Sequence, residues 1–191
     1  MRFDEILEEV RQGHHRAVDA FLERHGRDLD VLASWCVESL RRGGKVLFFG
    51  NGGSAAHAQH LASELVNRFD RDRGALAALA LAADVSVLTS IANDTAFERI
   101  FARQIEALGH KGDVAVAISA SGRSRNVLEG LRAARSAGLR SAAITGEAPE
   151  IATLADLALV VPSAEVARIQ EVQLVAGHVL CRRIEDLLEE G

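Results

Sequence analysis

The 191-residue chain has no tyrosine, one tryptophan, two prolines and two cysteines. Cys36 and Cys181 lie far apart and form no Cys-x-x-Cys pair, so the sequence offers neither a disulfide framework nor a cysteine-rich metal site. We expect two buried thiols. The chain also lacks an apolar run of transmembrane length, and its acidic, amphipathic N-terminus is unlike a signal peptide. The expected location is therefore the cytoplasm.

A positive charge excess is also missing. The formal net charge is −5, and acidic residues are interleaved with the arginines. Because nucleic-acid-binding surfaces usually carry a basic stripe, we expect no nucleic-acid partner, and we expect no membrane partner. Hydrophobic residues make up 48% of the chain, and charged residues make up 26%. This composition is typical of one globular domain with a sizeable core.

Strand-like and helical patterns alternate after the first 43 residues. Residues 1–43 predict two helices, broken near the sequence RHGRD. Strands are expected at 45–49, 75–81, 114–119, 140–145 and 157–162. Helices are expected at 54–69, 96–108, 124–137, 151–154 and 166–190. Because such alternation produces parallel sheets covered on both faces, we predict a single α/β domain. It has N-terminal helices (1–43), an α/β core (44–165) and a C-terminal helix (166–191).

Two loops follow predicted strands, at the ends where open α/β sheets bind ligands. In GNGGS (50–54), glycines allow close backbone approach to an anion, the next helix offers free N–H groups, and Ser54 could cap that helix. An ordinary tight turn is an equal alternative, since no Walker A or G-x-G-x-x-G motif is present. SASGRS (119–124) offers three hydroxyls before another helix. The two loops together favour a phosphorylated sugar as the ligand.

Three ionisable residues lie on the predicted helix after Ser54. His60 and Glu64 are four residues apart and therefore share one face. They could chelate a metal or pair an acid with a base, or they could form only a surface ion pair. His57 lies three residues before His60 and could either join them or be solvated.

The predicted C-terminal helix carries Gln170 and His178, eight residues or roughly 12 Å apart. One metal ion could hardly join both within a straight helix, unless the helix bends, the side chains stretch or another subunit intervenes. Because apolar residues surround His178, the residues alone favour a buried core histidine that bonds to a backbone carbonyl. Asn93 and Asp94, in ANDTAF, could start a helix, with Asp94 or Thr95 as its cap, or could reach a bound sugar.

In order along the chain, GNGGSAAHAQHLASELVNRF, SIANDTAFERIFARQ, GDVAVAISASGRSRNVLEGLRAAR and ARIQEVQLVAGHVL resemble proteins with the sugar-isomerase (SIS) fold. More closely, they resemble bacterial phosphoheptose isomerases, which convert sedoheptulose 7-phosphate to D-glycero-D-manno-heptose 7-phosphate. The resemblance covers nearly the whole chain. It implies an SIS-type three-layer sandwich, in which helices flank a five-stranded parallel sheet, with an N-terminal helical extension.

The resemblance also implies residue roles. Glu64 and His178 would be the acid–base pair for isomerisation through an enediol, a role that suits a carboxylate and an imidazole. One metal ion per subunit, commonly zinc, would be held by His60, Glu64, Gln170 and His178. Substrate contacts would come from Asn51, Gly52, Gly53, Ser54, Glu64, Asn93, Asp94, Ser119, Ala120, Ser121, Ser124 and Gln170, with the four serines holding the phosphate. The family implies homotetramers with sites between subunits, and a role in lipopolysaccharide or nucleotide-heptose biosynthesis.

Three positions depart from the family pattern. His57 stands where Asp is more frequent, Ala120 where Thr is common, and Ala167 where some members have Asp. The alternative function is a non-catalytic SIS-domain binding protein of the replication-initiator-associating type, which NRFDRDR and ALGHKGDV resemble. Those proteins typically lack the glutamate and the terminal-helix histidine. The presence of Glu64 and His178 therefore favours the enzyme.

Overall fold

Short apolar segments form the centre of the fold. The computed structural model describes residues 2–190, and its five strands pair in the order β2-β1-β3-β4-β5. All neighbouring strands are parallel. The strands are β1 (Val46–Gly50), β2 (Ala78–Ala80), β3 (Val114–Ser119), β4 (Arg140–Thr145) and β5 (Leu157–Val160). Every residue of β1 and β3 is buried, as strands covered on both faces require. The predicted five-stranded parallel sheet is confirmed.

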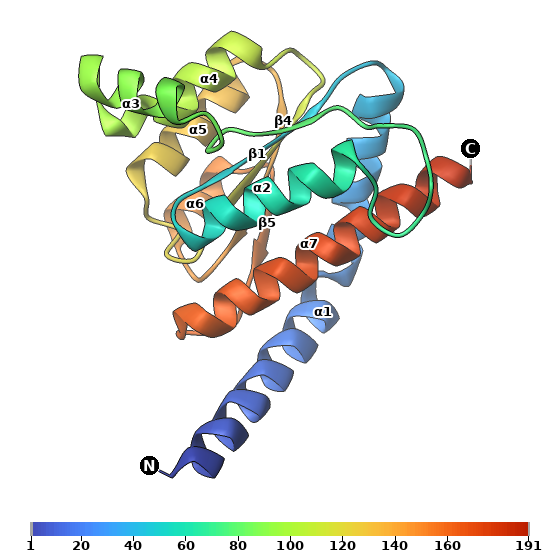
Figure 1. The fold of residues 1–191 in the computed structure, drawn as a ribbon, viewed down its shortest axis with the longest axis vertical. Helices are drawn as coiled ribbons and strands as arrows, with labels where there is room; N and C mark the ends of the chain where they lie inside the picture. Colours follow the sequence, from blue (N-terminus) through green and yellow to red (C-terminus); the bar gives the residue numbers. More distant parts are fainter. Residues whose placement is uncertain (1, 191) are drawn as a thin grey trace.

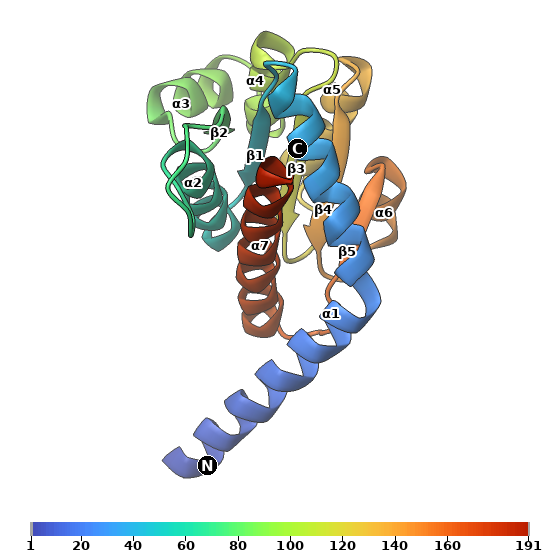
Figure 2. The same cartoon turned by 90° about the vertical axis from the view of Figure 1, so that its right-hand side faces the viewer.

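Helices cover both faces of the sheet and complete a three-layer sandwich (Figures 1 and 2). One layer contains α1 (Phe3–Arg41), α2 (Gly53–Val66) and α7 (Val166–Glu189). The other contains α3 (Val85–Asp94), the 3-10 turn η1 (Phe97–Arg99), α4 (Ile100–Leu108), α5 (Arg125–Ser136) and α6 (Pro149–Leu154). A hydrophobic core lies on each face of the sheet. Strand β1 contributes side chains to both cores in alternation, because successive side chains point to opposite faces. Val46 and Phe48 pack with the first layer, and Leu47 and Phe49 pack with the second.

The prediction of two N-terminal helices is wrong, since α1 runs unbroken for 39 residues. Gly26 lowers helix propensity, but it is exposed and its helical conformation crowds no neighbour. Buried residues continue past it at helical spacing, with Phe21 and His25 before and Leu29 after. His25 also anchors the helix, because its Nε2 accepts the N–H of Val160 at 3.1 Å. Tertiary packing therefore outweighs the local glycine signal.

The region between β2 and β3 also differs from expectation. Strand β2 has three residues rather than seven, and α3 follows it where no helix was expected. Asp84 starts α3 by accepting the N–H of Val87 at 3.0 Å. Asn93 and Asp94 end this helix, and Thr95 is its C-cap, so their interpretation as a helix start is wrong. The helix expected at 96–108 is divided into η1 and α4.

The C-terminal half of α1 packs beside α7, whereas the N-terminal half projects away from the sandwich (Figures 1 and 2). Four apolar residues on this projection are exposed: Phe3, Ile6, Leu7 and Val10. Both cysteines are buried and unpaired, as expected, and burial raises the pKa of both thiols. Within residues 2–190, no helix combines the length and the apolar character needed to cross a bilayer.

Candidate active site

The two loops that the sequence singled out lie next to each other at the carboxyl edge of the sheet. β1 and β3 are neighbours, with Gly50 opposite Ile118, so the turns that follow them share one edge. Both turns contain a glycine with positive φ, +53° at Gly52 and +61° at Gly122. Residues with side chains rarely adopt these angles. The fold thus places two glycine-containing turns, each opening a helix, where parallel sheets bind ligands.

The glycine-rich turn is tightly packed on both sides. A Cβ atom at Gly50 would lie 2.4 Å from the carbonyl oxygen of Ile118, and one at Gly53 would lie 2.6 Å from Nε2 of Gln170. The N-cap of α2 is Gly52, so the expectation that Ser54 caps this helix is wrong. The buried Ser54 hydroxyl instead donates to Oε1 of Gln173 over 3.4 Å. The N–H groups of Ser54 and Ala55 already donate to the carbonyl oxygen of Asn51, whereas the Gly53 N–H has no partner within residues 2–190 and remains available to an anion.

The side chain of Asn51 is hydrogen-bonded to another side chain. Its Nδ2 donates to Oδ1 of Asn126, and Nδ2 of Asn126 donates back to Oδ1 of Asn51, both over 2.8 Å. The second residue of this pair was not singled out from the sequence. Its only sequence signal is an asparagine at a buried position of an amphipathic helix.

In the serine loop, the hydroxyls differ in how they are used. Ser119 Oγ accepts the N–H of Gly122 at 3.1 Å, and Ser121 Oγ accepts the N–H of Arg123 at 3.3 Å. Ser124 is the N-cap of α5, yet its side chain makes no capping hydrogen bond. Ser121 is exposed and Ser124 half-buried, so both can turn to a ligand at the start of α5. Ala120, between Ser119 and Ser121, is half-buried and offers only backbone groups.

Helices α2 and α7 lie side by side and run in the same direction (Figure 1). Residues met in turn along α2 therefore contact residues met in the same order along α7. Gly53 contacts Gln170 at one end of this seam. Leu61 contacts Gly177 further along, where a Cβ atom on residue 177 would lie 2.5 Å from the leucine. His60 meets His178 at the same level. The α2–α7 seam thus runs from the glycine-rich turn to a histidine pair.

The histidine pair consists of two rings whose Nε2 atoms are 2.8 Å apart. The Glu64 carboxylate lies 3.5 Å from the other ring nitrogen, Nδ1, of His60. Burial, reinforced by the neighbouring His60, lowers the pKa of His178 below its ordinary value, although Glu64 opposes this shift. His178 is therefore neutral at pH 7 and able to accept a proton. It is half-buried and pairs with another ring, so the alternative of a core histidine satisfied by a backbone carbonyl does not hold.

Beyond the histidine pair, a buried carboxylate fastens the segment after α2. Glu185 accepts the N–H groups of Phe69, Asp70 and Arg71 at 2.9 to 3.1 Å, and its Oε1 pairs with Nε of Arg73 at 2.9 Å. The Phe69 ring lies 5.4 Å from the His178 ring, centroid to centroid. The fastened segment therefore forms one wall beside His178. The sequence pattern does not reveal this contact, because an isolated glutamate near a helix end gives no local signal of burial.

The remaining sequence-predicted residues lie apart from the histidine pair. Gln170 is at the glycine end of the seam. Asn93 and Asp94 are exposed at the end of α3, where Nδ2 of Asn93 donates to Asp94 at 2.8 Å. No hydrogen bond within residues 2–190 joins these two residues to the other candidates. Ala167 is exposed in the first turn of α7.

His57 is half-buried one turn before His60, and its Nδ1 is buried without a hydrogen-bond partner in the described structure. Burial first, and then the nearby His60 and His178, lower the pKa of His57. The ring is therefore neutral at pH 7. It lies along α2 between Gly53 and His60, and so between the two ends of the seam.

The candidate metal ligands fit a metal ion by residue type more than by their arrangement. Within residues 2–190, no group of three His, Cys, Asp or Glu side chains is arranged to hold one. Two imidazole nitrogens nevertheless face each other, and a carboxylate lies within 3.5 Å of one ring. Imidazole and carboxylate are donors that zinc accepts. The residue types fit zinc. A single chain brings the Nε2 atoms of His60 and His178 together, whereas Glu64 lies beside the other nitrogen of the His60 ring.

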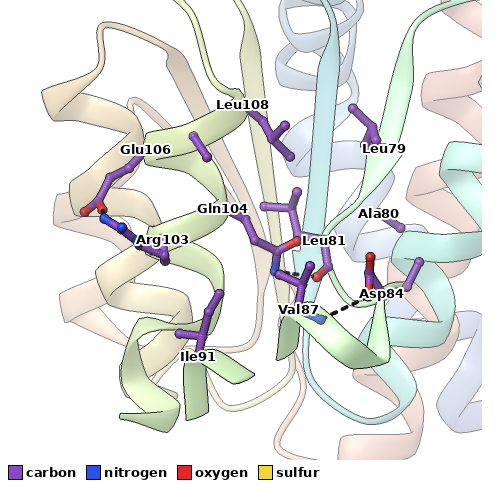
Figure 3. A pocket seen from close by; sticks show the side chains of 12 residues that line it. Leu79, Ala80, Leu81, Asp84, Val87, Ile91, Arg103, Gln104, Glu106 and Leu108 are labelled. Atoms are coloured by element: carbon purple, nitrogen blue, oxygen red, sulfur yellow. Dashed lines mark hydrogen bonds and ion pairs between the residues drawn. The ribbon is translucent and has the colours of Figure 1, made fainter. Parts of the chain in front are cut away.

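A second region has a cavity of about 610 Å³, on the opposite face of the sheet (Figure 3). Its lining is largely apolar and comes from β2, α3 and α4, with Leu81, Val87 and Ile91 among its residues. It contains none of the residues that the sequence singled out as candidates. A different cavity, of about 520 Å³, has Phe69, His178, Arg182 and Arg183 in its lining, so His178 can be reached from outside.

Comparison with known proteins identifies relatives of this chain and of its fold. Residues 11–146 match the SIS domain family. The phosphoheptose isomerase of Paramagnetospirillum magneticum is 56% identical over 155 residues, 81% of each chain. That of Thermodesulfovibrio yellowstonii is 43% identical, over 97% of this chain and 94% of the relative.

Solved structures give the same result. Phosphoheptose isomerase GmhA from Neisseria gonorrhoeae superposes with a TM-score of 0.91 at 36% identity, and the Francisella tularensis phosphoheptose isomerase with 0.93 at 33%. Each alignment covers 97% of this chain and 100% of the solved chain. The likeness therefore extends over nearly the whole chain.

Proposed function

The chain belongs to the phosphoheptose isomerase family of SIS domain proteins, and from this premise we propose that it converts sedoheptulose 7-phosphate to D-glycero-D-manno-heptose 7-phosphate. It is a sugar phosphate isomerase of heptose biosynthesis. What we propose is the exact substrate and the residues that transfer the protons. One observation carries it. The α2–α7 seam joins an anion-binding turn to an acid–base cluster formed by His60, Glu64 and His178.

The phosphate is held at the glycine end of the seam. The serine loop supplies the hydroxyls of Ser121 and Ser124, and the first turns of α2 and α5 supply N–H groups. The positive ends of both helix dipoles favour a dianion there. This arrangement binds the end of the sugar that does not react and directs the carbonyl end along the seam.

The reaction itself needs only proton transfers. A base removes a proton from C1 of the ketose while the C2 oxygen gains one, which gives the enediol. The C1 hydroxyl then loses its proton, and C2 receives one, which leaves an aldehyde at C1 and a hydroxyl at C2. Glu64 and His178 share these transfers, since a carboxylate and a neutral imidazole can each accept and return a proton near pH 7.

We propose one zinc ion per subunit, held by His60, Glu64, Gln170 and His178. When bound, zinc supplies a Lewis acid that polarises the carbonyl. The facing Nε2 atoms of the two histidines support this proposal. Gln170 lies at the other end of the seam in a single chain, so its participation requires movement or a second subunit.

We also propose a homotetramer with sites between subunits, in the cytoplasm, with neither nucleic acid nor membrane as a partner. The exposed apolar residues on the projecting half of α1 support association, since Phe3, Ile6, Leu7 and Val10 recur at helical spacing. Each exposes more than 40% of its surface. The net charge of −5 argues against nucleic acid.

The experiment is to incubate the purified protein with sedoheptulose 7-phosphate, with and without added zinc, and to follow formation of the heptose 7-phosphate by NMR. We expect product, and a lower rate after treatment with a chelator. Folded protein that binds the sugar phosphate but forms no product under either condition would instead indicate a non-catalytic SIS-domain binding protein.

A further inference from the structure

A reciprocal pair of amides joins the two ligand-binding turns. Asn51 follows the last residue of β1, and Asn126 lies in the first turn of α5, 75 residues later. Each side chain donates one N–H to the oxygen of the other, over 2.8 Å in both directions. Asn126 is only 2% exposed, and its Oδ1 also accepts the N–H of Val127 at 3.0 Å. Its orientation is therefore fixed by helix α5 itself.

Strand pairing alone does not set the distance between the turns. The register of β1 and β3 ends with Gly50 opposite Ile118, and both segments then bend through glycines of positive φ. Beyond that point the glycine-rich turn and the start of α5 are connected through Asn51 and Asn126. Two hydrogen bonds between planar amides constrain both distance and orientation.

We propose that Asn126 is a positioning residue of the active site: through Asn51 it fixes the glycine-rich turn against the serine loop, so that both turns bind one phosphate group. This inference rests on the proposed function. It also changes the expected role of Asn51, whose side chain then serves mainly to hold the turn rather than to contact the sugar.

The amide type matters at both positions. Each residue must present a donor and an acceptor at once, which an asparagine does and an aspartate at pH 7 does not. Alanine at either position leaves the other amide without its partner. The two residues should therefore act as one unit, and the loss of either should have the same effect as the loss of both.

The test is a double-mutant cycle with Asn51→Ala, Asn126→Ala and the double variant, measured on isomerisation of sedoheptulose 7-phosphate. We expect each single variant to raise KM about tenfold with kcat within about threefold, as expected when hydrogen bonds that organise phosphate binding are lost. The double variant should have the KM of the single variants. Additive increases in KM, or a fall in kcat with KM unchanged, would overturn the proposal.

Gln104→Ala is the matched control. Gln104 is also a buried amide with two hydrogen bonds, to the carbonyls of Leu81 and Ile100 at 2.8 Å, but it lies beside the cavity on the opposite face (Figure 3). It should lower the melting temperature without changing KM. An equal rise in KM in Gln104→Ala would mean that general loosening, rather than positioning, explains the effect.

A second measurement separates this inference from the proposed function. Binding of inorganic phosphate by calorimetry needs no turnover, and it should weaken equally in the two single variants and the double variant. If the wild type binds phosphate but does not isomerise the sugar, the function fails while the positioning role is still tested. If Asn126→Ala does not fold, the half-buried Asn51→Ala measures the same connection, and unchanged phosphate affinity in it contradicts the proposal.

Discussion

The polar side chains at the two ends of the α2–α7 seam differ in how many hydrogen-bond partners they find within the protein. At the glycine end, polar side chains find partners within the protein: Asn51 with Asn126, and Ser54 with Gln173, which in turn donates to the carbonyl of Ile144 at 3.0 Å. At the histidine end, the Nε2 atoms of His60 and His178 face each other and Glu64 lies 3.5 Å from Nδ1 of His60, while a buried nitrogen of His57 has no partner within residues 2–190.

Under the proposed function, this difference separates phosphate binding from proton transfer. A buried polar group without a partner costs free energy, and such groups in native proteins often mark functional sites. At the glycine end most polar side chains already have partners, which suits the holding of a phosphate, although the buried Thr145 hydroxyl beside Gly122 has none within residues 2–190. The histidine end has donors and acceptors that an added group would complete, which suits metal binding and proton transfer.

The largest expected effect is on turnover, from changes at the histidine end. Glu64→Gln and His178→Ala each remove a group that can carry a proton, so kcat should fall by about 10² to 10⁴. The fold and phosphate binding should persist, because the glycine end is held by other residues. Circular dichroism, phosphate calorimetry and the NMR assay for product check these three outcomes.

His110→Ala is the control for this experiment, since His110 is an exposed histidine in the loop before β3. It should retain full activity. Near-normal rates in both Glu64→Gln and His178→Ala would show that the histidine end is not the reactive one, and the contrast between the two ends would lose its functional meaning.

The next largest effect concerns the stability of the segment that walls the histidine end. Glu185→Gln leaves Arg73 without its buried counter-charge, and we expect a loss of roughly 3 kcal/mol in the free energy of unfolding. Glu189→Gln, on the same helix, is the matched control. Its pairing with Arg71 is largely exposed and should be worth at most about 1 kcal/mol. Urea denaturation measures both.

The pH dependence of this difference has a defined sign. Burial tends to raise the pKa of Glu185, but the hydrogen bonds from three backbone N–H groups and the charge of Arg73 outweigh it, so the pKa is below the ordinary 4.5. The stabilisation is then complete above pH 4.5 and is lost as the pH falls through the folded-state pKa. Wild type and Glu185→Gln should thus converge in stability in acid. A constant difference down to pH 3 would contradict the assignment.

The features that sequence predicted well are those carried by local patterns. Apolar runs such as VAVAIS are buried strands, and the glycine-rich turn and the serine loop lie at the edge that follows from parallel pairing. The His60–Glu64 contact follows from helical spacing alone. In each case the relevant distance along the chain is short, and one periodicity determines the geometry.

The features that sequence missed depend on packing between distant segments. Gly26 is a local signal for a helix end, but the burial of Phe21 and Leu29 keeps α1 continuous. Asn126, Gln173 and Glu185 find their partners 75, 119 and 114 to 116 residues away. No spacing rule relates such pairs, because the partner is chosen by the tertiary fold.

The smallest expected effect is at His57, which lies between the two ends of the seam. His57→Asp places a carboxylate one helical turn from His60 and near His178, where a neutral ring now lies. A nearby negative charge favours the protonated imidazole, so the pKa of His178 should rise, by less than about one unit at this exposure. NMR titration of the imidazole protons in metal-free protein measures the shift.

His57→Asn is the control: it removes the ring without adding charge and should leave only the small change due to loss of His57 itself. If both variants shift the titration equally, burial alone controls the histidine end. If only His57→Asp does so, charge at position 57 tunes the basicity of His178.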